Sequence, residues 1–484
     1  MRTLVWFRAD LRTLDNPALH HAATRSDRGV IGVFIISPEQ WREHDWAPVK
    51  VEFLLRHLRQ LSASLAKLNI PLLIEHTPRF EGQPKLLLGL ARAHSCDSIC
   101  FNEEYELNEW RRDEALKSLA AKHGVSVSTF NDQCLIRPGE VRTGEGRFFT
   151  VFTPFKKALY RAMESGGLAD GAFEPLPSPR KQERIPGIGS SPVPERVAGF
   201  ESTVDPSLWP AGESAALERL NDFCTRRIRR YKDRRDYPGE DATSVLSPYL
   251  TAGSVTHRQM ISAALQVNGG RLDAGDPGCV HWISEVAWRE FYRHILVGFP
   301  RVCTHKAFKP ATERIRWSGN EDHFNAWREG RTGVPIVDAG MRQLATTGWM
   351  HNRVRMIVAM YLTKDLFIDW RWGERHFMRN LIDGDLASNN GGWQWSASTG
   401  TDAAPYFRIF NPVTQSRKFD PDGAYIRRYV PELSDLDGGK DGDGPIHDPG
   451  ELPALLRSTV DYPRPLVDRG QVKDRVLRAF QSIS

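Results

Sequence analysis

The sequence has few cysteines, and none has the spacing of a metal-binding pair. Its six Cys are scattered over 484 residues without a CxxC motif. We therefore expect neither a zinc site nor a disulfide framework, and we expect the protein to reside in a reducing cytoplasm. No apolar run approaches the roughly 18 residues of a membrane span. The opening residues, MRTLVWFRADLR, lack the long apolar core of a secretory signal. These absences predict a soluble cytoplasmic protein with no metal site and no membrane anchor.

The chain also lacks a strong excess of charge and the usual dinucleotide fingerprint. Its 65 basic and 60 acidic residues give a net charge of +5, which is weak evidence for a polyanionic partner. No GxGxxG motif follows the first apolar run. A ligand of this part of the chain is expected at the carboxyl ends of its strands, as in open α/β sheets generally.

The first third of the chain alternates short apolar runs with helical patterns. Five runs have the composition of buried strands: residues 3–8, 29–37, 70–76, 98–102 and 125–131. Three segments between them carry apolar residues at helical spacing: 49–68, 83–95 and 107–124. This alternation predicts a Rossmann-like parallel α/β sheet with helices on both faces.

The composition changes after this region. Residues 173–210 are rich in Pro, Ser, Gly and charge, which is typical of an extended linker. Beyond them strand signals vanish, and helical periodicity recurs at residues 215–231, 280–298, 334–348 and 351–367. We therefore expect an α/β domain at residues 1–135, an interdomain linker at 136–210 and an all-α domain at 211–484.

The densest group of polar and aromatic side chains lies in residues 383–407, DGDLASNNGGWQWSASTGTDAAPYF. In a plain glycine-rich loop, Asp383, Asp385, Asn389 and Asn390 would each need a buried partner beside two indoles. A polar planar ligand solves this problem, because carboxylates and amides can hydrogen-bond a heteroaromatic edge. A metal is not favoured, because no His joins the acids.

Four other segments are ambiguous when each is taken alone. HWISEVAWREFYRH places Trp282, Glu285 and Arg289 on one helical face, which also suits an ordinary amphipathic helix with a surface ion pair. GWMHNRVRMIVAMY suits a core helix. The basic run 226–238 suits a phosphate-contacting patch and a solvated helix end equally. TSVLSP, residues 243–248, suits an anion cradle or a plain N-cap.

Taken together, these motifs resemble the photolyase/cryptochrome family, and more narrowly the microbial class I cyclobutane pyrimidine dimer photolyases. The resemblance covers nearly the whole chain, from VWFRADLRTLDNPAL through FTPFKKA, TSVLSPYL, WREFYRH and PIVDAGMRQLATTGWMHNRVRM to IDGDLASNNGGWQWSASTGTDAAPYFRIFNP. It implies an N-terminal antenna-chromophore domain and a C-terminal helical FAD-binding domain. It also implies a carbon–carbon lyase that repairs UV-damaged DNA. Light-excited, reduced FAD donates an electron to the pyrimidine dimer, the ring splits, and the electron returns.

The resemblance assigns FAD-binding positions to residues of this chain. They are Tyr231, Thr243, Ser244, Val245, Leu246, Ser247, Trp282, Arg289, Asn352, Arg355, Asp383, Gly384, Asp385 and Asn389. Among them, Asp383 is expected to pair with Arg355, Asp385 to accept from the flavin edge, and Asn389 to face the flavin N5. The family's electron-transfer chain is matched by Trp393, Trp370 and Trp317.

The resemblance also implies a pocket for a flipped dimer and contacts to DNA phosphates. Glu285 matches the catalytic residue that hydrogen-bonds the bases of the dimer. The other matching positions are Trp288 and Trp395 for stacking, Asn352 and Met356 for the pocket wall, and Arg235 and Arg353 for phosphates.

Three alternatives remain open at this point: a cryptochrome-type blue-light photoreceptor, repair of (6-4) photoproducts, and a nucleic-acid-binding flavoprotein without catalysis. Cryptochromes often differ at the position of Asn389, and enzymes that repair (6-4) photoproducts typically carry His at the position of Met356. Met356 and Trp395 therefore favour repair of the cyclobutane dimer.

A second, light-harvesting chromophore is expected in the N-terminal domain. His44, Asn108 and Glu109 match the positions that hold methenyltetrahydrofolate in relatives. The chain departs from the family at Thr304, where a Lys is usual, so a deazaflavin or an empty site also remains open. We expect a monomer.

Overall fold

The computed structural model describes residues 1–483 and divides into two compact units. The first unit comprises Met1–Arg229, Ser244–Cys303 and Ile382–Asp385, and the second comprises Arg230–Thr243, Thr304–Leu381 and Leu386–Ser484. This division does not coincide with the boundaries at residues 135 and 210 that composition suggests, and those boundaries stay predictions.

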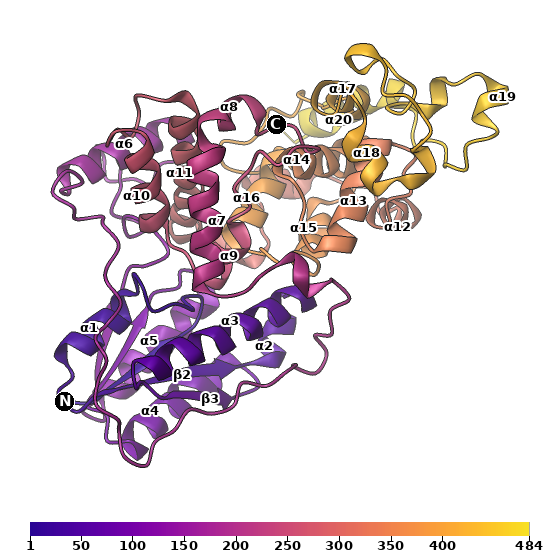
Figure 1. Cartoon of the computed structure of the whole chain (residues 1–484). Coiled ribbons are helices and arrows are strands. Elements are labelled where there is room, and N and C mark those ends of the chain that lie inside the picture. Colours follow the sequence, from indigo (N-terminus) through magenta and orange to yellow (C-terminus); the bar gives the residue numbers. More distant parts are fainter. Residues whose placement is uncertain (484) are drawn as a thin grey trace. The chain divides into compact units, whose positions relative to one another are not determined.

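The first unit contains a five-stranded parallel sheet (Figure 1). Its strands are β1 (Thr3–Phe7), β2 (Val30–Ile36), β3 (Leu72–His76), β4 (Ser98–Asn102) and β5 (Ser126–Phe130). Their order is β3-β2-β1-β4-β5, and every neighbouring pair is parallel. The predicted Rossmann-like sheet is confirmed, with all five strands inside the predicted runs.

Both faces of the sheet are covered by helices. One face packs against α1 (Pro17–Arg25) and α3 (Pro48–Lys67), and the other against α4 (Gln83–Ala93) and α5 (Leu107–Ala121). Side chains of β1 alternate between the two hydrophobic clusters, with Val5 and Phe7 in one and Leu4 and Trp6 in the other. Strands β1 and β2 are almost wholly apolar because both of their faces are buried, whereas β5 at the edge of the sheet is rich in Ser and Thr and partly exposed. The short helix α2 (Pro38–Glu43) follows β2.

The remaining helices of the first unit are α6 (Phe152–Ser165), α7 (Glu213–Arg226), α9 (Ser247–Ala252), α10 (His257–Val267) and α11 (Pro277–Gly298). Helix α6 lies inside the expected linker 136–210. It forms because Phe152, Phe155, Leu159 and Met163 make one buried stripe, and it packs against α11. Residues 175–205 form neither helix nor strand, as expected of an extended segment.

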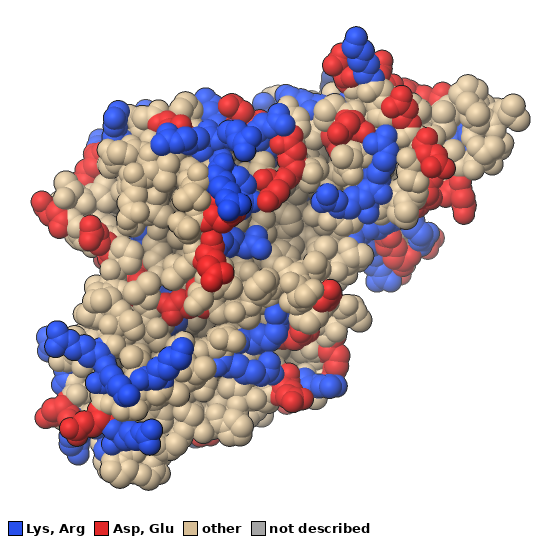
Figure 2. All heavy atoms as spheres, viewed as in Figure 1, with Lys and Arg blue, Asp and Glu red and all other residues tan. Residues whose placement is uncertain are grey.

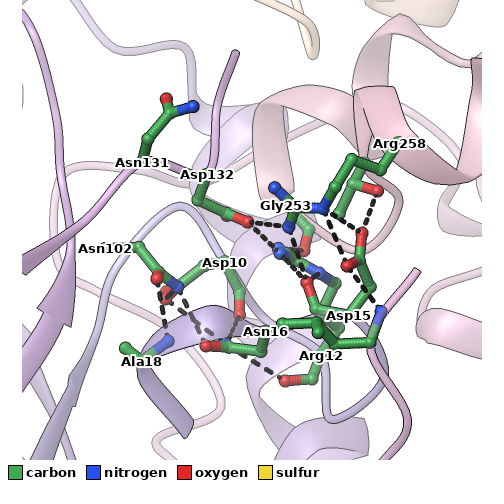
Figure 3. Close-up of polar contacts among 12 residues, drawn as sticks. Asp10, Arg12, Asp15, Asn16, Ala18, Asn102, Asn131, Asp132, Gly253 and Arg258 are labelled. Carbon is green, nitrogen blue, oxygen red and sulfur yellow. Dashed lines mark hydrogen bonds and ion pairs between the residues drawn. The ribbon is translucent and has the colours of Figure 1, made fainter. Parts of the chain in front are cut away.

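A buried polar network ties the end of β1 to α9 and α10 within the first unit (Figure 3). Arg12 donates to the backbone carbonyl of Gly253 over 2.9 Å and pairs with Asp132. Arg258 pairs with Asp15 at 2.9 Å and with Asp132 at 3.0 Å. Gly253 has φ +68°, and a Cβ there would lie 1.8 Å from the carbonyl oxygen of Ala9. Only glycine fits where these segments approach.

Among the described residues, the second unit contains helices and loops and no β-strand, apart from one isolated bridge between Ser318 and Ile368. Its α-helices are α8 (Tyr231–Arg234), α12 (Glu321–Arg328), α13 (Pro335–Thr347), α14 (Asn352–Met360), α15 (Trp370–Met378), α16 (Leu386–Ala397), α17 (Pro412–Phe419), α18 (Ala424–Tyr429), α19 (Ala454–Arg457) and α20 (Val472–Gln481). None of the helices within residues 1–483 combines the length and the apolarity needed to cross a bilayer.

The helix predicted at residues 351–367 is present over residues 352–365, but its hydrogen-bond pattern changes after Met360. Helix α14 ends at Met360, and a π-helical turn, η6 (Tyr361–Asp365), follows it. The Leu366 N–H donates to the Tyr361 carbonyl over 2.9 Å. Such a turn inserts one extra residue and changes the phase of the buried face, which the apolar pattern alone does not show.

Candidate active site

Asp383 lies beside α9 in the first unit. The Ser247 hydroxyl donates to Asp383 Oδ2 over 2.6 Å, and the Thr251 hydroxyl donates to the Asp383 carbonyl over 3.4 Å. Val245 has φ +49°, which is rare for a β-branched residue. The structure therefore holds TSVLSP in a strained turn against one acid of the 383–407 segment.

Asp385 accepts from two arginines of α11. Arg289 Nη2 lies 3.1 Å and Arg293 Nη2 lies 2.8 Å from Asp385 Oδ2. Burial disfavours the charged form of both arginines. The carboxylate of Asp385 nevertheless holds the pKa of Arg293 above its usual value, whereas burial lowers the pKa of Arg289. Arg293 Nη1 is buried without a hydrogen-bond partner within residues 1–483. An unsatisfied buried donor costs stability unless a ligand supplies an acceptor.

Lys50 extends the same cluster. Its ammonium donates to the Gly384 carbonyl over 2.7 Å, and burial lowers its pKa to about 8. Sequence reasoning identified neither Lys50 nor Arg293. Arg293 follows Arg289 by four residues on one helix, so helical spacing could have indicated it. Lys50 is brought to the cluster only by the fold.

Trp282, Glu285 and Trp288 also lie on α11 of the first unit. Trp282 Nε1 is 3.4 Å from Ser244 Oγ, and Glu285 Oε1 is 3.6 Å from His281 Nε2. The ring of Phe152 stacks on Trp288, with centroids 3.7 Å apart. Arg289, which was considered as a surface ion-pair partner of Glu285, pairs with the buried Asp385.

The three candidate antenna residues form a cluster in the first unit. His44 Nε2 accepts from Asn108 Nδ2 at 3.0 Å, and His44 Nδ1 lies 3.4 Å from Glu109 Oε1. Burial, with the charges of Lys50 and Arg112, lowers the pKa of His44 to about 4, so the imidazole is neutral near pH 7. Burial and neighbouring carboxylates raise the pKa of Glu109 to about 8. Glu109 Oε2 is buried and has no partner within the described chain.

Asn389 and Asn390 converge on one buried acid in the second unit. Asn389 Nδ2 donates to the Glu374 backbone carbonyl over 3.0 Å, and Asn390 Nδ2 donates to Glu374 Oε1 over 2.9 Å. The other oxygen of Glu374 lies 3.0 Å from Nδ1 of the half-exposed His305. These contacts fix the orientation of both amides. Glu374 and His305 were not identified from the sequence, which gives no signal for them.

The three tryptophans of the expected electron-transfer chain share the core of the second unit. Trp370 and Trp393 are buried in its main hydrophobic cluster, and Trp317 packs against that cluster with part of its surface exposed. Gly373 lies so close to the Trp393 indole that a Cβ there would be 2.1 Å from it. A graded exposure of this kind suits a chain of indoles between the surface and the interior, but core packing explains each indole equally well.

A cavity of about 540 Å³ in the second unit brings together three of the expected DNA-contacting residues: Arg353, Met356 and Trp395. Eight further residues line it: Asp233, Asp236, Tyr237, Arg408, Phe410, Gln415, Lys418 and Phe419. This mixture of basic and aromatic side chains around a large cavity can hold an extruded base and a neighbouring phosphate. Gln415, Lys418 and Phe419 lie beyond the motifs used in sequence reasoning, whereas Arg408 and Phe410 lie within the last motif without having been assigned a role.

The other expected residues of the second unit have distinct settings. Tyr231 is buried, with the guanidinium of Arg235 5.3 Å from its ring centroid. Asn352 is exposed at the start of α14, and Arg355 Nε donates to the Met350 carbonyl over 2.8 Å. Thr243 is half-buried. The expected pairing of Asp383 with Arg355 stays a prediction.

Comparisons with known proteins cover both parts of the chain. A family model described as DNA photolyase matches residues 3–180, and one described as the FAD-binding domain of DNA photolyase matches residues 282–482. A deoxyribodipyrimidine photo-lyase of Salmonella typhimurium is 42% identical over 482 residues, which cover 99% of this chain and 98% of the relative.

Two solved structures share the fold over the whole chain. A bacterial class III photolyase from Agrobacterium tumefaciens matches with a TM-score of 0.85 and 35% identity, over 100% of this chain and 97% of that one. A cryptochrome from Synechocystis sp. PCC6803 matches with a TM-score of 0.87 and 29% identity, over 99% of both chains.

Proposed function

The chain belongs to the DNA photolyase family, and we propose that it repairs cyclobutane pyrimidine dimers in UV-damaged DNA as a light-driven deoxyribodipyrimidine photo-lyase. The observation that carries this proposal is the cavity in which Met356 and Trp395 lie together with Arg353. An indole offers a stacking surface, worth about 1–3 kcal/mol per base, and an arginine beside it offers a phosphate contact. The unbranched Met356 supplies an apolar wall without a hydrogen-bonding group.

The residues of the chain fit FAD as the cofactor. Asp385 and its two arginines form a buried charged group in which one donor, Arg293 Nη1, has no acceptor among residues 1–483. A polar heterocycle or a phosphate would supply that acceptor. We propose that the isoalloxazine and phosphates are held by the fourteen positions named from the sequence, among them Ser247, Arg289, Asp383 and Asn389. FAD, when bound, supplies the light-driven electron donor.

The chain's own groups have separate roles in this proposal. Trp288 and Trp395 stack on the extruded dimer, while Arg235 and Arg353 hold its phosphates. Glu285 hydrogen-bonds the bases where negative charge develops, and such a bond is worth more in a dry pocket than in water. Trp317, Trp370 and Trp393 carry electrons to the cofactor from the surface. Asn389 is oriented for its cofactor contact by the Glu374 carbonyl.

A second chromophore is proposed at His44, Asn108 and Glu109. The buried, unpartnered Glu109 Oε2 suits a ligand with a hydrogen-bond donor, and the neutral amino group of a pterin such as methenyltetrahydrofolate provides one. A deazaflavin or an empty site remains the alternative, since Thr304 departs from the family's usual Lys. We also propose that the protein acts as a monomer in the cytoplasm, which suits its six unpaired cysteines.

Binding in the dark separates this proposal from its closest alternative. Three matched oligonucleotide duplexes carry a cyclobutane dimer, a (6-4) photoproduct or no lesion. The dimer-containing duplex is expected to bind the flavin-loaded protein most tightly. Tightest binding to the (6-4) duplex would assign the pocket to that lesion, and equal affinity for all three would favour a photoreceptor or a plain DNA-binding flavoprotein.

A further inference from the structure

Arg353, an expected phosphate contact, forms an ion pair with an acid inside the protein. Its Nη2 lies 2.8 Å from Oδ2 of Asp236, and both residues line the cavity that contains Met356 and Trp395. Both side chains are partly buried, with 17% of Arg353 and 30% of Asp236 exposed. Arg235 Nε lies 3.6 Å from Oδ1 of the same carboxylate. One acid therefore contacts both arginines that are expected to hold DNA phosphates.

Two acids, Asp233 and Asp236, line this cavity, and Asp236 is the one paired with Arg353. His351 adjoins both arginines, and burial lowers its pKa to about 4, so it is neutral near pH 7. Phe419 covers the Arg353 guanidinium, 4.4 Å from the ring centroid. Residues 230–243 contain four basic and four acidic side chains. In Figure 2, basic and acidic side chains lie close together at the place of α8.

We propose that Asp236 is an internal competitor for DNA phosphate, which occupies Arg353 and Arg235 in the free protein and so limits the affinity for all DNA. This inference rests on the proposed function, in which both arginines contact phosphates. A carboxylate offers an arginine two acceptor oxygens, as a phosphate does. Because it belongs to the same chain, it is present beside the guanidinium whenever DNA is absent.

The consequence is a lower electrostatic contribution to binding. A phosphate must displace Asp236 or share the arginine with it, and an arginine already neutralised releases fewer DNA counterions. The effect does not depend on a lesion, because it acts on phosphate contacts alone. Asp236 thereby helps the protein to leave undamaged DNA, while stacking in the cavity retains the protein at a dimer.

The decisive variant is Asp236→Asn, which keeps the shape and one acceptor oxygen but removes the charge. Binding to undamaged and dimer-containing duplexes is measured by fluorescence anisotropy in the dark, over a series of salt concentrations. Both affinities are expected to rise by about two- to fivefold, the scale of a partly exposed ion pair. The salt dependence is expected to steepen by about 0.9 for each arginine released.

Two further variants isolate the proposed pair. Asp233→Asn removes the same charge from the wall of the same cavity without altering the Asp236–Arg353 pair, so it is expected to raise affinity less. In an Arg353→Ala background, Asp236→Asn is expected to lose most of its effect. Circular dichroism and thermal unfolding of each variant show whether it is folded.

The outcomes are distinct. If Asp236→Asn weakened binding, Asp236 would instead be holding Arg353 in position for DNA, and the inference would be overturned. Equal gains from Asp233→Asn and Asp236→Asn would attribute the effect to net charge and would also overturn it. A protein that binds undamaged DNA as expected but does not prefer dimers would contradict the proposed function and leave the competition by Asp236 intact.

Discussion

The ring of Phe152 on α6 lies almost parallel to the indole of Trp288 on α11, with centroids 3.7 Å apart and planes 10° apart. Tyr292 approaches the same indole, with centroids 5.7 Å apart. The orientation of Trp288 is therefore set in part by a residue of the segment 136–210, which the sequence analysis expects to be an interdomain linker.

Replacing Phe152 by Ala should weaken binding to dimer-containing DNA, because Trp288 would lose the ring that fixes its plane. The expected loss is about 0.5–1.5 kcal/mol, the scale of one aromatic pair. Phe152→Tyr keeps the ring and serves as the matched control. Fluorescence anisotropy measures the affinity of each variant for both kinds of DNA. The account would be contradicted if Phe152→Ala weakened binding to undamaged DNA as much as to damaged DNA, or if it left both affinities unchanged.

Stacking and phosphate contacts should separate in a comparison of damaged and undamaged DNA. Trp395→Ala and Trp288→Ala should each cost about 1–3 kcal/mol of affinity for dimer-containing DNA, with little change for undamaged DNA. Arg353→Ala should weaken both and lower the magnitude of the salt slope by about 0.9. Trp110→Ala, which removes an exposed indole from α5, is the control. If the Trp and Arg variants changed both affinities in the same ratio, the indoles would be structural.

Photoreduction of bound, oxidised FAD should depend on Trp370. Trp370→Phe should slow this reduction by light and thiol strongly, because the indole is an electron relay in the proposed chain. Repair by enzyme reduced beforehand should persist. Trp372→Phe changes a second indole on the same helix and should reduce normally. The flavin absorbance during illumination measures the reduction of FAD in both variants. Normal reduction in Trp370→Phe would exclude this residue from the electron-transfer chain.

Stability should fall in mild acid because of buried neutral histidines. Burial lowers the pKa of His57 from 6.5 to about 4, so the unfolded chain binds a proton in this range before the folded one does. The stabilisation is complete above pH 6.5 and is lost as pH falls towards about 4, by at most about 1.4 kcal/mol per pH unit. Four other histidines behave alike: His44, His294, His351 and His376.

His57→Gln tests this prediction, because Gln stays neutral throughout the range. Urea unfolding is measured at several pH values from about 4.5 to 8. The stability difference between the original protein and the variant should shrink as pH falls below 6.5. A difference that is constant with pH would show that His57 does not titrate differently in the folded and unfolded states.

The sheet could be predicted because its central strands are buried on both faces and form continuous apolar runs between turn signals. Helix α6 was not predicted, because residues 136–210 were assigned to the linker as a whole, although the Pro- and Ser-rich composition begins only at residue 173. The π-turn at Tyr361–Asp365 was invisible, because it shifts the phase of a helix without any change in composition.

The candidate site was predictable only where its residues share a sequence motif. Asp383, Asp385 and Asn389 stand out because acids and amides next to indoles need partners. Glu374 reaches Asn389 and Asn390 from another helix, and Asp236 reaches Arg353 from a distant segment. Neither contact follows from spacing, since tertiary packing alone brings them together.

The most direct test of the proposed repair is the conversion of dimers into monomers under light. The flavin-loaded, reduced protein is mixed with an oligonucleotide that contains one thymine dimer, and the products are separated after illumination or darkness. We predict that intact thymines return in light and that the dimer persists in the dark. A dimer that survives illumination, with folded protein, reduced FAD and bound DNA all verified, would contradict the account.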